Sequence, residues 1–134
     1  ENLGSTTFTT STSDQSSAGF TAWKALADAA DVPAAGPFVP NSYDATFMMA
    51  LAIEKAGSAD RSAIAGALRA IANAPGETIL PGEFAKAKSI LAAGGDIHYV
   101  GASGPQDFDE NGDVAGYFSA NVVKDGAWEG SIIE

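Results

Sequence analysis

The chain has 134 residues, with 7 Lys and Arg against 17 Asp and Glu, a single His and no Cys. The net charge of −10 argues against nucleic acid or an anionic membrane surface as a partner, because both attract basic patches. The lack of Cys excludes a disulfide scaffold, a cysteine zinc site and a thiol nucleophile, and the 46% apolar composition is typical of a folded globular domain.

The sequence shows no sign of a membrane span or of a targeting signal. No apolar run approaches the ~18 residues that a transmembrane helix needs. Residues 1–4 contain neither an initiator Met nor the basic and apolar regions of a signal peptide. We therefore expect a processed product or an excised fragment of a longer protein.

The N-terminal part of the sequence predicts one strand and one helix. Residues 5–10 are β-branched and aromatic, which favours a short strand. Ser16 or Ser17 can cap a helix over residues 18–30, whose apolar side chains recur every three or four positions. Pro33 disfavours helical backbone at the residue before it, and so ends this helix.

A second helix, apolar on nearly every side, is predicted after a short extended piece. The extended piece covers residues 37–40, which begin and end with proline. Asn41 or Ser42 then caps a helix over residues 43–56, and Gly57 ends it in left-handed backbone.

Two more helices alternate with short strands. Asp60 caps a third helix over residues 61–72, and a fourth helix covers residues 82–93. Residues 77–80, between these helices, form a short strand or an extended link. Residues 97–100 have the character of another strand.

The remainder of the chain predicts β-hairpins. Residues 106–109 and 114–124 flank the turn at residues 110–112, and residues 125–126 make a second hairpin turn before Trp128. The order of elements therefore predicts an α/β fold, with a short parallel sheet flanked by helices and antiparallel C-terminal hairpins.

An acidic turn invites comparison with a calcium loop. Asp107, Asp109, Asn111 and Gly112 occupy the first, third, fifth and sixth positions of such a loop, but Phe118 stands where the bidentate Glu should be. The flanks are also strand-like rather than helical. We expect a solvated β-turn that binds no metal.

No motif in the sequence indicates catalysis. His98 has no nucleophile within a recognisable spacing, and we expect it to face solvent or a crevice from its strand. Residues 101–105 are not a nucleophile elbow, because Pro105 replaces the second glycine. With no phosphate-binding glycine loop either, the sequence predicts no catalytic residue, no metal and no cofactor.

Motifs within residues 36–57, 75–99 and 101–126, in this order, resemble those of bacterial branched-chain amino-acid ABC transporter substrate-binding proteins. Residues 36–57 contain Tyr-Asp-Ala and Ala-Ile-Glu-Lys-Ala-Gly, which resemble a helix of that family. Residues 75–99 look like an insertion found in one subgroup. Residues 101–126 include Phe-Asp-Glu-Asn-Gly-Asp-Val, which is similar to the family's C-terminal hairpin.

The resemblance implies the C-terminal portion of a type I periplasmic binding protein, like the leucine/isoleucine/valine-binding proteins. Such proteins have two α/β lobes joined by three crossing segments. By this analogy residues 1–10 are a crossing strand, and residues 11–100 are the α/β part of the first lobe. Residues 101–134 are then the third crossing segment and the hairpins of the second lobe. The polar anchors of the ligand would lie outside this chain.

The function that the resemblance implies is solute transport rather than catalysis. The chain would belong to a periplasmic, extracytoplasmic component of an ABC importer. That component would bind a branched-chain or other small aliphatic amino acid between its lobes and deliver it to a membrane permease. A ligand-sensing domain of a receptor built on the same fold is the alternative.

The resemblance also suggests three ligand-binding residues. Ligands of open α/β sheets bind beyond the carboxyl ends of the strands. Phe38, at the end of an expected Phe38–Val39 strand, matches an aromatic wall of the family. Tyr43 matches as well, although packing would equally explain it, and Asn41 is a cleft candidate that could instead cap a helix.

Alone, such a fragment should self-associate. A lone strand at residues 6–10 and the C-terminal hairpins would leave unpaired edges, with Phe118, Val122 and Trp128 exposed. A dimer with exchanged or augmented sheets would cover them. The alternative is a monomer whose tail folds back on its own sheet.

Overall fold

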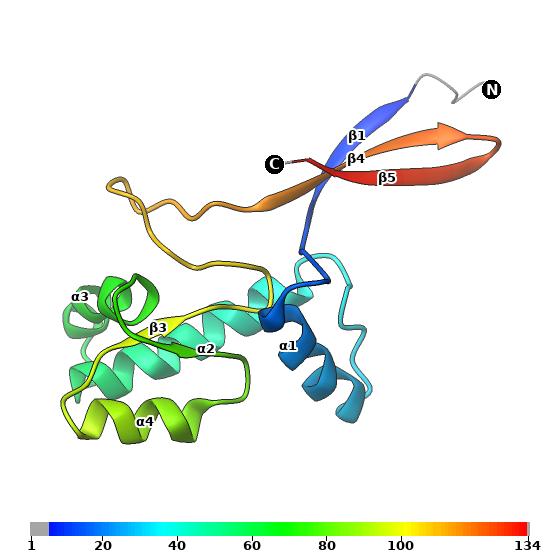
Figure 1. Ribbon diagram of the computed structural model, residues 1–134. Coiled ribbons are helices and arrows are strands. Elements are labelled where there is room, and N and C mark those ends of the chain that lie inside the picture. The colour runs from blue at the N-terminus through cyan, green and yellow to red at the C-terminus, as the bar shows by residue number, and fades with distance from the viewer. Residues whose placement is uncertain (1–5, 134) are drawn as a thin grey trace.

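The computed structural model describes residues 6–133, which form a helical body and a separate three-stranded sheet (Figure 1). Two stretches of chain join the sheet to the body, one after the first strand and one before the fourth. The predicted start of the first strand, at residue 5, lies outside the described residues. Within residues 6–133, no helix is long and apolar enough to cross a bilayer.

The elements confirm the predicted α/β class. The described helices are α1 (Ala18–Ala29), α2 (Val39–Ala56), α3 (Arg61–Ala72) and α4 (Phe84–Ala92). The described strands are β1 (Thr7–Thr12), β2 (Glu77–Ile79), β3 (Ile97–Tyr99), β4 (Tyr117–Lys124) and β5 (Ala127–Ile133). Strands β2 and β3 pair in parallel inside the body, whereas β1, β4 and β5 form the antiparallel sheet.

Side-chain caps explain why α1 and α3 begin where the sequence predicts. The Ser17 hydroxyl accepts a hydrogen bond from the Phe20 amide at 3.1 Å. The Asp60 carboxylate accepts from the amides of Ser62 and Ala63 at 3.0 and 3.2 Å. Amides in the first turn of a helix have no carbonyl partner within the helix, so the side-chain oxygens of these capping residues accept their hydrogen bonds instead.

The start of α2 differs from the prediction, because the extended piece and the caps at Asn41 and Ser42 are wrong. The helix begins at Val39, and Phe38 precedes it in left-handed backbone with a φ of 59°. Pro40 fits the first turn because amides there need no helical carbonyl, and its ring presets a helical φ. Ser42 lies inside the helix and donates its hydroxyl to the Phe38 carbonyl at 2.9 Å.

Of the two predicted C-terminal hairpins, the second is confirmed and the first is much shorter. In the first, Phe108 forms an isolated bridge with Val114, and the following strand starts only at Tyr117. In the second, β4 and β5 are joined by Asp125 and Gly126, both with positive φ. Positive φ at both central residues gives a twist that matches the flanking strands.

The buried core lies in the body, between α2, α3, α4 and the parallel strands. Its largest fully buried apolar side chains are Leu51, Ile71, Ile79, Ile97 and Tyr99. A smaller cluster packs α1 against the turn after β3, through Phe20, Trp23, Ala27 and Ala102. Val39 and Tyr43 of α2 pack against this cluster, so the beginnings of α1 and α2 both lie close to the turn after β3.

The separate sheet carries apolar side chains on both faces. The expected exposure of Phe118, Val122 and Trp128 is confirmed, at 49%, 40% and 54%. Alternation along the strands places Phe118 and Val122 on one face, and Phe8 and Trp128 in edge-on contact on the other. The expectation of a lone first strand is wrong, because β1 pairs along its length with β4 of the same chain. Its outer edge has no partner among the described residues.

Candidate ligand-binding site

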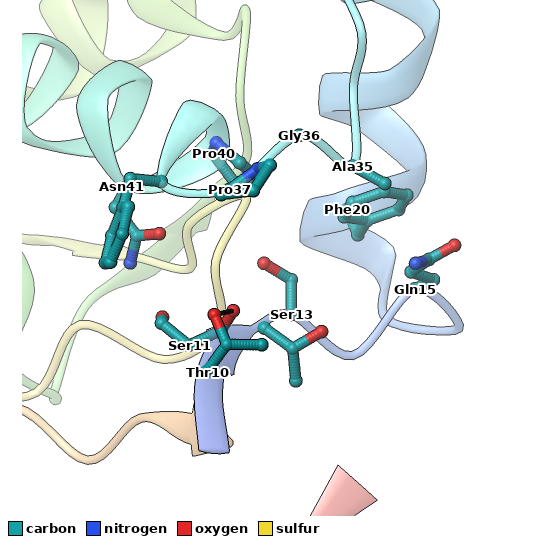
Figure 2. A pocket seen from close by; sticks show the side chains of 12 residues that line it. Thr10, Ser11, Ser13, Gln15, Phe20, Ala35, Gly36, Pro37, Pro40 and Asn41 are labelled. Atoms are coloured by element: carbon teal, nitrogen blue, oxygen red, sulfur yellow. Dashed lines mark hydrogen bonds between the residues drawn. The ribbon is translucent and has the colours of Figure 1, made fainter. Parts of the chain in front are cut away.

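A pocket lies where the end of β1 meets the beginnings of α1 and α2 (Figure 2). Residues 10–13, 35–38 and 40–41 line it, together with Gln15 and Phe20. Its volume is about 140 Å³, well below the ~300 Å³ at which sites for drug-sized ligands begin, so it suits a small solute.

The pocket combines uncharged polar groups with apolar walls. Hydroxyl groups come from the end of β1 and the residues after it, and Gln15 and Asn41 contribute amides. Phe20, Phe38 and Pro40 supply apolar surface. The first turns of α1 and α2 both border the pocket, and the positive end of a helix dipole favours an anionic group such as a carboxylate.

Two of the three predicted ligand-binding residues line this pocket, and the third does not. Phe38 is 61% exposed and Asn41 lies in the first turn of α2. The predicted Phe38–Val39 strand is wrong, because these two residues form the start of α2 instead. Tyr43 packs instead: its ring lies 4.6 Å from that of Trp23, and its hydroxyl accepts from the Gly82 amide at 2.9 Å.

Sequence reasoning missed the contribution of the segment after β1. The sequence predicted no binding role for the residues between the first strand and the first helix, yet residues 10–13 form one wall of the pocket. The signal that could have found them is a run of Thr and Ser that begins in a strand and continues beyond it. Such hydroxyls can donate and accept hydrogen bonds at the strand's end.

A buried carboxylate lies one helical turn beyond Asn41. The side chain of Asp44 is 1% exposed. Its Oδ1 accepts from the Tyr99 hydroxyl at 2.7 Å and from the Ala102 amide at 2.8 Å. Its Oδ2 accepts from the amide and the hydroxyl of Ser103 at 2.8 and 2.6 Å. The sequence predicted no role for Asp44 beyond its place in the Tyr-Asp-Ala motif.

The tyrosine in this cluster stays protonated and can act as the donor. Burial, and then the neighbouring Asp44 carboxylate, raise the pKa of Tyr99 far above its usual value. Both effects penalise the phenolate. The hydroxyl therefore keeps its proton, and its hydrogen bond to Asp44, throughout the physiological pH range.

His98 points to the acidic turn rather than to a nucleophile. Its Nε2 lies 3.2 Å from Oδ2 of Asp107, and the other oxygen of Asp107 accepts from the Ala74 amide at 3.2 Å. The pair links β3 to the chain that leaves the body. Such an arrangement joins two segments and carries no sign of a catalytic dyad.

Backbone amides of the acidic turn donate hydrogen bonds to the carboxylate of Asp109 within the same turn. Oδ1 of Asp109 accepts from the amides of Asn111 and Asp113 at 2.8 and 2.9 Å. The hydrogen bond from the Asp113 amide is the main reason why the pKa of Asp109 lies below its usual value. Within residues 6–133, no three acidic or histidine side chains converge to hold a metal ion.

We expect calcium at about 1 mM, the weak end of extracellular calcium sites, to leave the melting temperature unchanged. The physical reason is that Asp109 already satisfies amides of its own turn. Thermal unfolding with and without calcium measures this. A calcium-dependent rise in melting temperature that Asp109→Ala abolishes would contradict the prediction.

Similarity to known proteins defines the class of protein to which this chain belongs. Residues 3–119 match the family described as receptor family ligand binding region, and the chain belongs to this family of type I periplasmic binding proteins. Over 84 residues it is 34% identical to the chemotactic signal transduction system substrate-binding protein BasB of Halobacterium salinarum. That match covers 63% of this chain and 20% of BasB, so the chain spans about a fifth of this relative. No solved structure matches the chain.

These similarities support a ligand-binding role. Both the family and the relative are described as binding proteins, and neither description is that of an enzyme. The pocket agrees with such a role, since its lining consists of uncharged polar and apolar side chains.

Proposed function

We propose that this chain is part of an extracytoplasmic binding protein for a small aliphatic amino acid or a related solute. The observation that carries the proposal is the position of the pocket in a member of a ligand-binding family. It lies beside the junction between the helical body and the sheet. In this proposal residues 1–10 and 101–134 cross to and build the second lobe, and residues 11–100 belong to the first.

The pocket's chemistry favours the amino-acid class. The exposed ring of Phe38 offers an apolar wall for an aliphatic side chain. The first turns of α1 and α2 favour a carboxylate. Rotation of the sheet relative to the body, through the two connecting stretches, would close the pocket as a hinge.

Delivery of the bound solute to the membrane permease of an ABC importer is the transport function that we propose. A second candidate is ligand sensing for a signalling partner. It is supported by the relative BasB, which is named as a substrate-binding protein of a chemotactic signal transduction system. Deletion of the gene separates the two, because the first role predicts lost uptake and the second predicts lost chemotaxis with uptake intact.

Calorimetry with leucine, isoleucine, valine, short amides and carboxylates tests the ligand class, on the longest encoded protein that contains this chain. We expect at least one aliphatic amino acid to bind. Phe38→Ala should then weaken binding roughly tenfold or more, because a buried aromatic contact contributes about 1.5–3 kcal/mol.

Tyr43→Phe is the matched control for this experiment. It keeps the aromatic packing with Trp23 and removes only the hydroxyl that accepts from the Gly82 amide. Affinity should therefore stay within about twofold of the original protein, since Tyr43 does not line the pocket. The absence of binding by every compound in the panel, or equal affinity in Phe38→Ala and the original protein, would count against the proposed ligand class.

We also propose that the 134-residue chain self-associates through its sheet. Both faces carry exposed apolar side chains, and the outer edges of β1 and β5 are unpaired among the described residues. Free strand edges and exposed apolar surface both favour association. The association is proposed for this chain, not for any longer protein that contains it.

A further inference from the structure

The buried carboxylate of Asp44 has an unusual set of partners. Side-chain and backbone donors surround it, and none of the ion pairs described within residues 6–133 includes it. A buried charge is costly unless hydrogen bonds replace its hydration. Here two consecutive amides, those of Ala102 and Ser103, form a small concave site for the anion. The hydroxyls of Tyr99 and Ser103 and, at 3.4 Å, the side-chain amide of Gln106 are its other donors.

The surrounding backbone is shaped to accept this carboxylate. A Cβ on Gly101 would lie 2.6 Å from Oδ2 of Asp44. A Cβ on Gly19, in α1, would lie 2.0 Å from the Gly101 carbonyl oxygen. The Gly101 amide donates to the Gly104 carbonyl at 2.9 Å, which closes the turn over residues 101–104. Helix α1 therefore meets this turn at backbone distance, and α2 meets it through the carboxylate of Asp44.

The same side of α2 also reaches the pocket. Asn41 and Asp44 are three residues apart, so they lie on one side of the helix. Asn41 lines the ligand pocket, and it also lines a second groove together with Ser103 and Gln106. The position of the turn over residues 101–104 and the position of the pocket wall are thus set by one turn of α2.

Beyond this turn, α3 holds the next part of the chain. The Asn73 side chain donates to the Phe108 carbonyl at 2.8 Å and accepts from the Phe108 amide at 3.0 Å. Arg69 donates to the Asp109 carbonyl. No described hydrogen bond ties Ala115 or Gly116 to the body within residues 6–133.

We propose that Asp44 is a positioning residue for the connection between the body and the sheet. Its carboxylate fixes the turn over residues 101–104 to α2 beside the pocket, so that the chain bends at residues 115–116. This goes beyond the proposed function, which assigns no role to Asp44. It rests on that function only for the consequence that a misplaced turn would misplace the pocket wall.

Site-resolved amide hydrogen exchange of the 134-residue chain, without ligand, tests the anchor. Asp44→Ala removes both acceptor oxygens, so the amides of Ala102 and Ser103 should exchange at least about tenfold faster. Asp44→Asn keeps one acceptor oxygen, so only one of these two amides should lose protection. Tyr99→Phe removes a different donor and should leave both amides protected.

Asp28→Asn is the matched control, because Asp28 is exposed and, among the described residues, its carboxylate pairs only with Lys24 on α1. It should change none of these exchange rates. If the Asp44→Ala protein does not fold, the loss of protection at only one of the two amides in Asp44→Asn tests the proposal. Unchanged protection of both amides in Asp44→Asn, or an equal loss across all amides of α3, would overturn the proposal, because the second result describes a merely stabilising residue.

A second measurement addresses position directly. The chain has no Cys, so Ala65→Cys on α3 and Ser131→Cys on β5 give a unique pair of spin-label sites. Dilution with unlabelled protein restricts the measurement to distances within one chain. Asp44→Asn should broaden the distance distribution and Asp28→Asn should not, and equal distributions in both would overturn the proposal. Neither measurement uses a ligand, so a failure of the proposed amino-acid binding would leave the outcome readable.

Discussion

Replacing Gly19 with alanine should lower the free energy of unfolding by about 3 kcal/mol or more. The added Cβ would lie 2.0 Å from the Gly101 carbonyl oxygen and 2.9 Å from its carbonyl carbon. Both are backbone atoms of the turn that Asp44 holds, so neither can move aside as a flexible side chain would. The helix would have to shift away from the turn, and the packing of Phe20 and Ala102 would be lost with it.

Gly66→Ala is the matched control, because it makes the same chemical change within α3. A Cβ at Gly66 meets nothing within 4 Å, and the residue lies in the interior of a helix. This variant should therefore gain about 0.5–1 kcal/mol, the usual helical advantage of Ala over Gly. Urea unfolding of the two variants, compared by midpoint at constant slope, measures both effects. A Gly19→Ala midpoint equal to that of the original protein would contradict the close approach of α1 to the turn.

The original chain should have a mass above that of a monomer in light scattering, and the mass should rise with concentration. The double variant Phe118→Thr, Trp128→Thr should return the chain to a monomer mass. These two side chains are about half exposed and lie on opposite faces of the sheet, so the variant removes apolar surface from both faces. Threonine preserves the strand, because its branched Cβ suits a pleated sheet.

Ser131→Thr on β5 is the control for self-association, since it keeps a hydroxyl on the same strand and removes no apolar surface. Its mass should match that of the original chain. A monomer mass for the original chain at every concentration would refute the proposed self-association.

Local chemistry explains the elements that the sequence predicted well. Helices α1 and α3 begin at Ser17 and Asp60 because a capping oxygen acts within three residues of itself. The turn between β4 and β5 is equally local, since Asp125 and Gly126 alone supply the positive φ values. The α/β class followed from the order of such elements.

The start of α2 shows where local rules gave an ambiguous answer. Asn41 and Ser42 are good capping residues, and the sequence alone favoured them. The helix instead begins at Val39, where a proline in the first turn costs no hydrogen bond. The earlier start of α2 replaces the expected Phe38–Val39 strand. Phe38 and Asn41 nevertheless line the pocket.

The acidic composition and the family resemblance can be read directly from the sequence, and the capped helices follow from residues close together in the chain. The contacts of Asp44 required the three-dimensional structure, since its partners Tyr99 and Ser103 lie 55 and 59 residues further along the chain. The pairing of β1 with β4 and the pocket built from three separate segments were decided in the same way. Contacts of this kind form only when packing brings distant segments together, and no local pattern of residues encodes the distance between them.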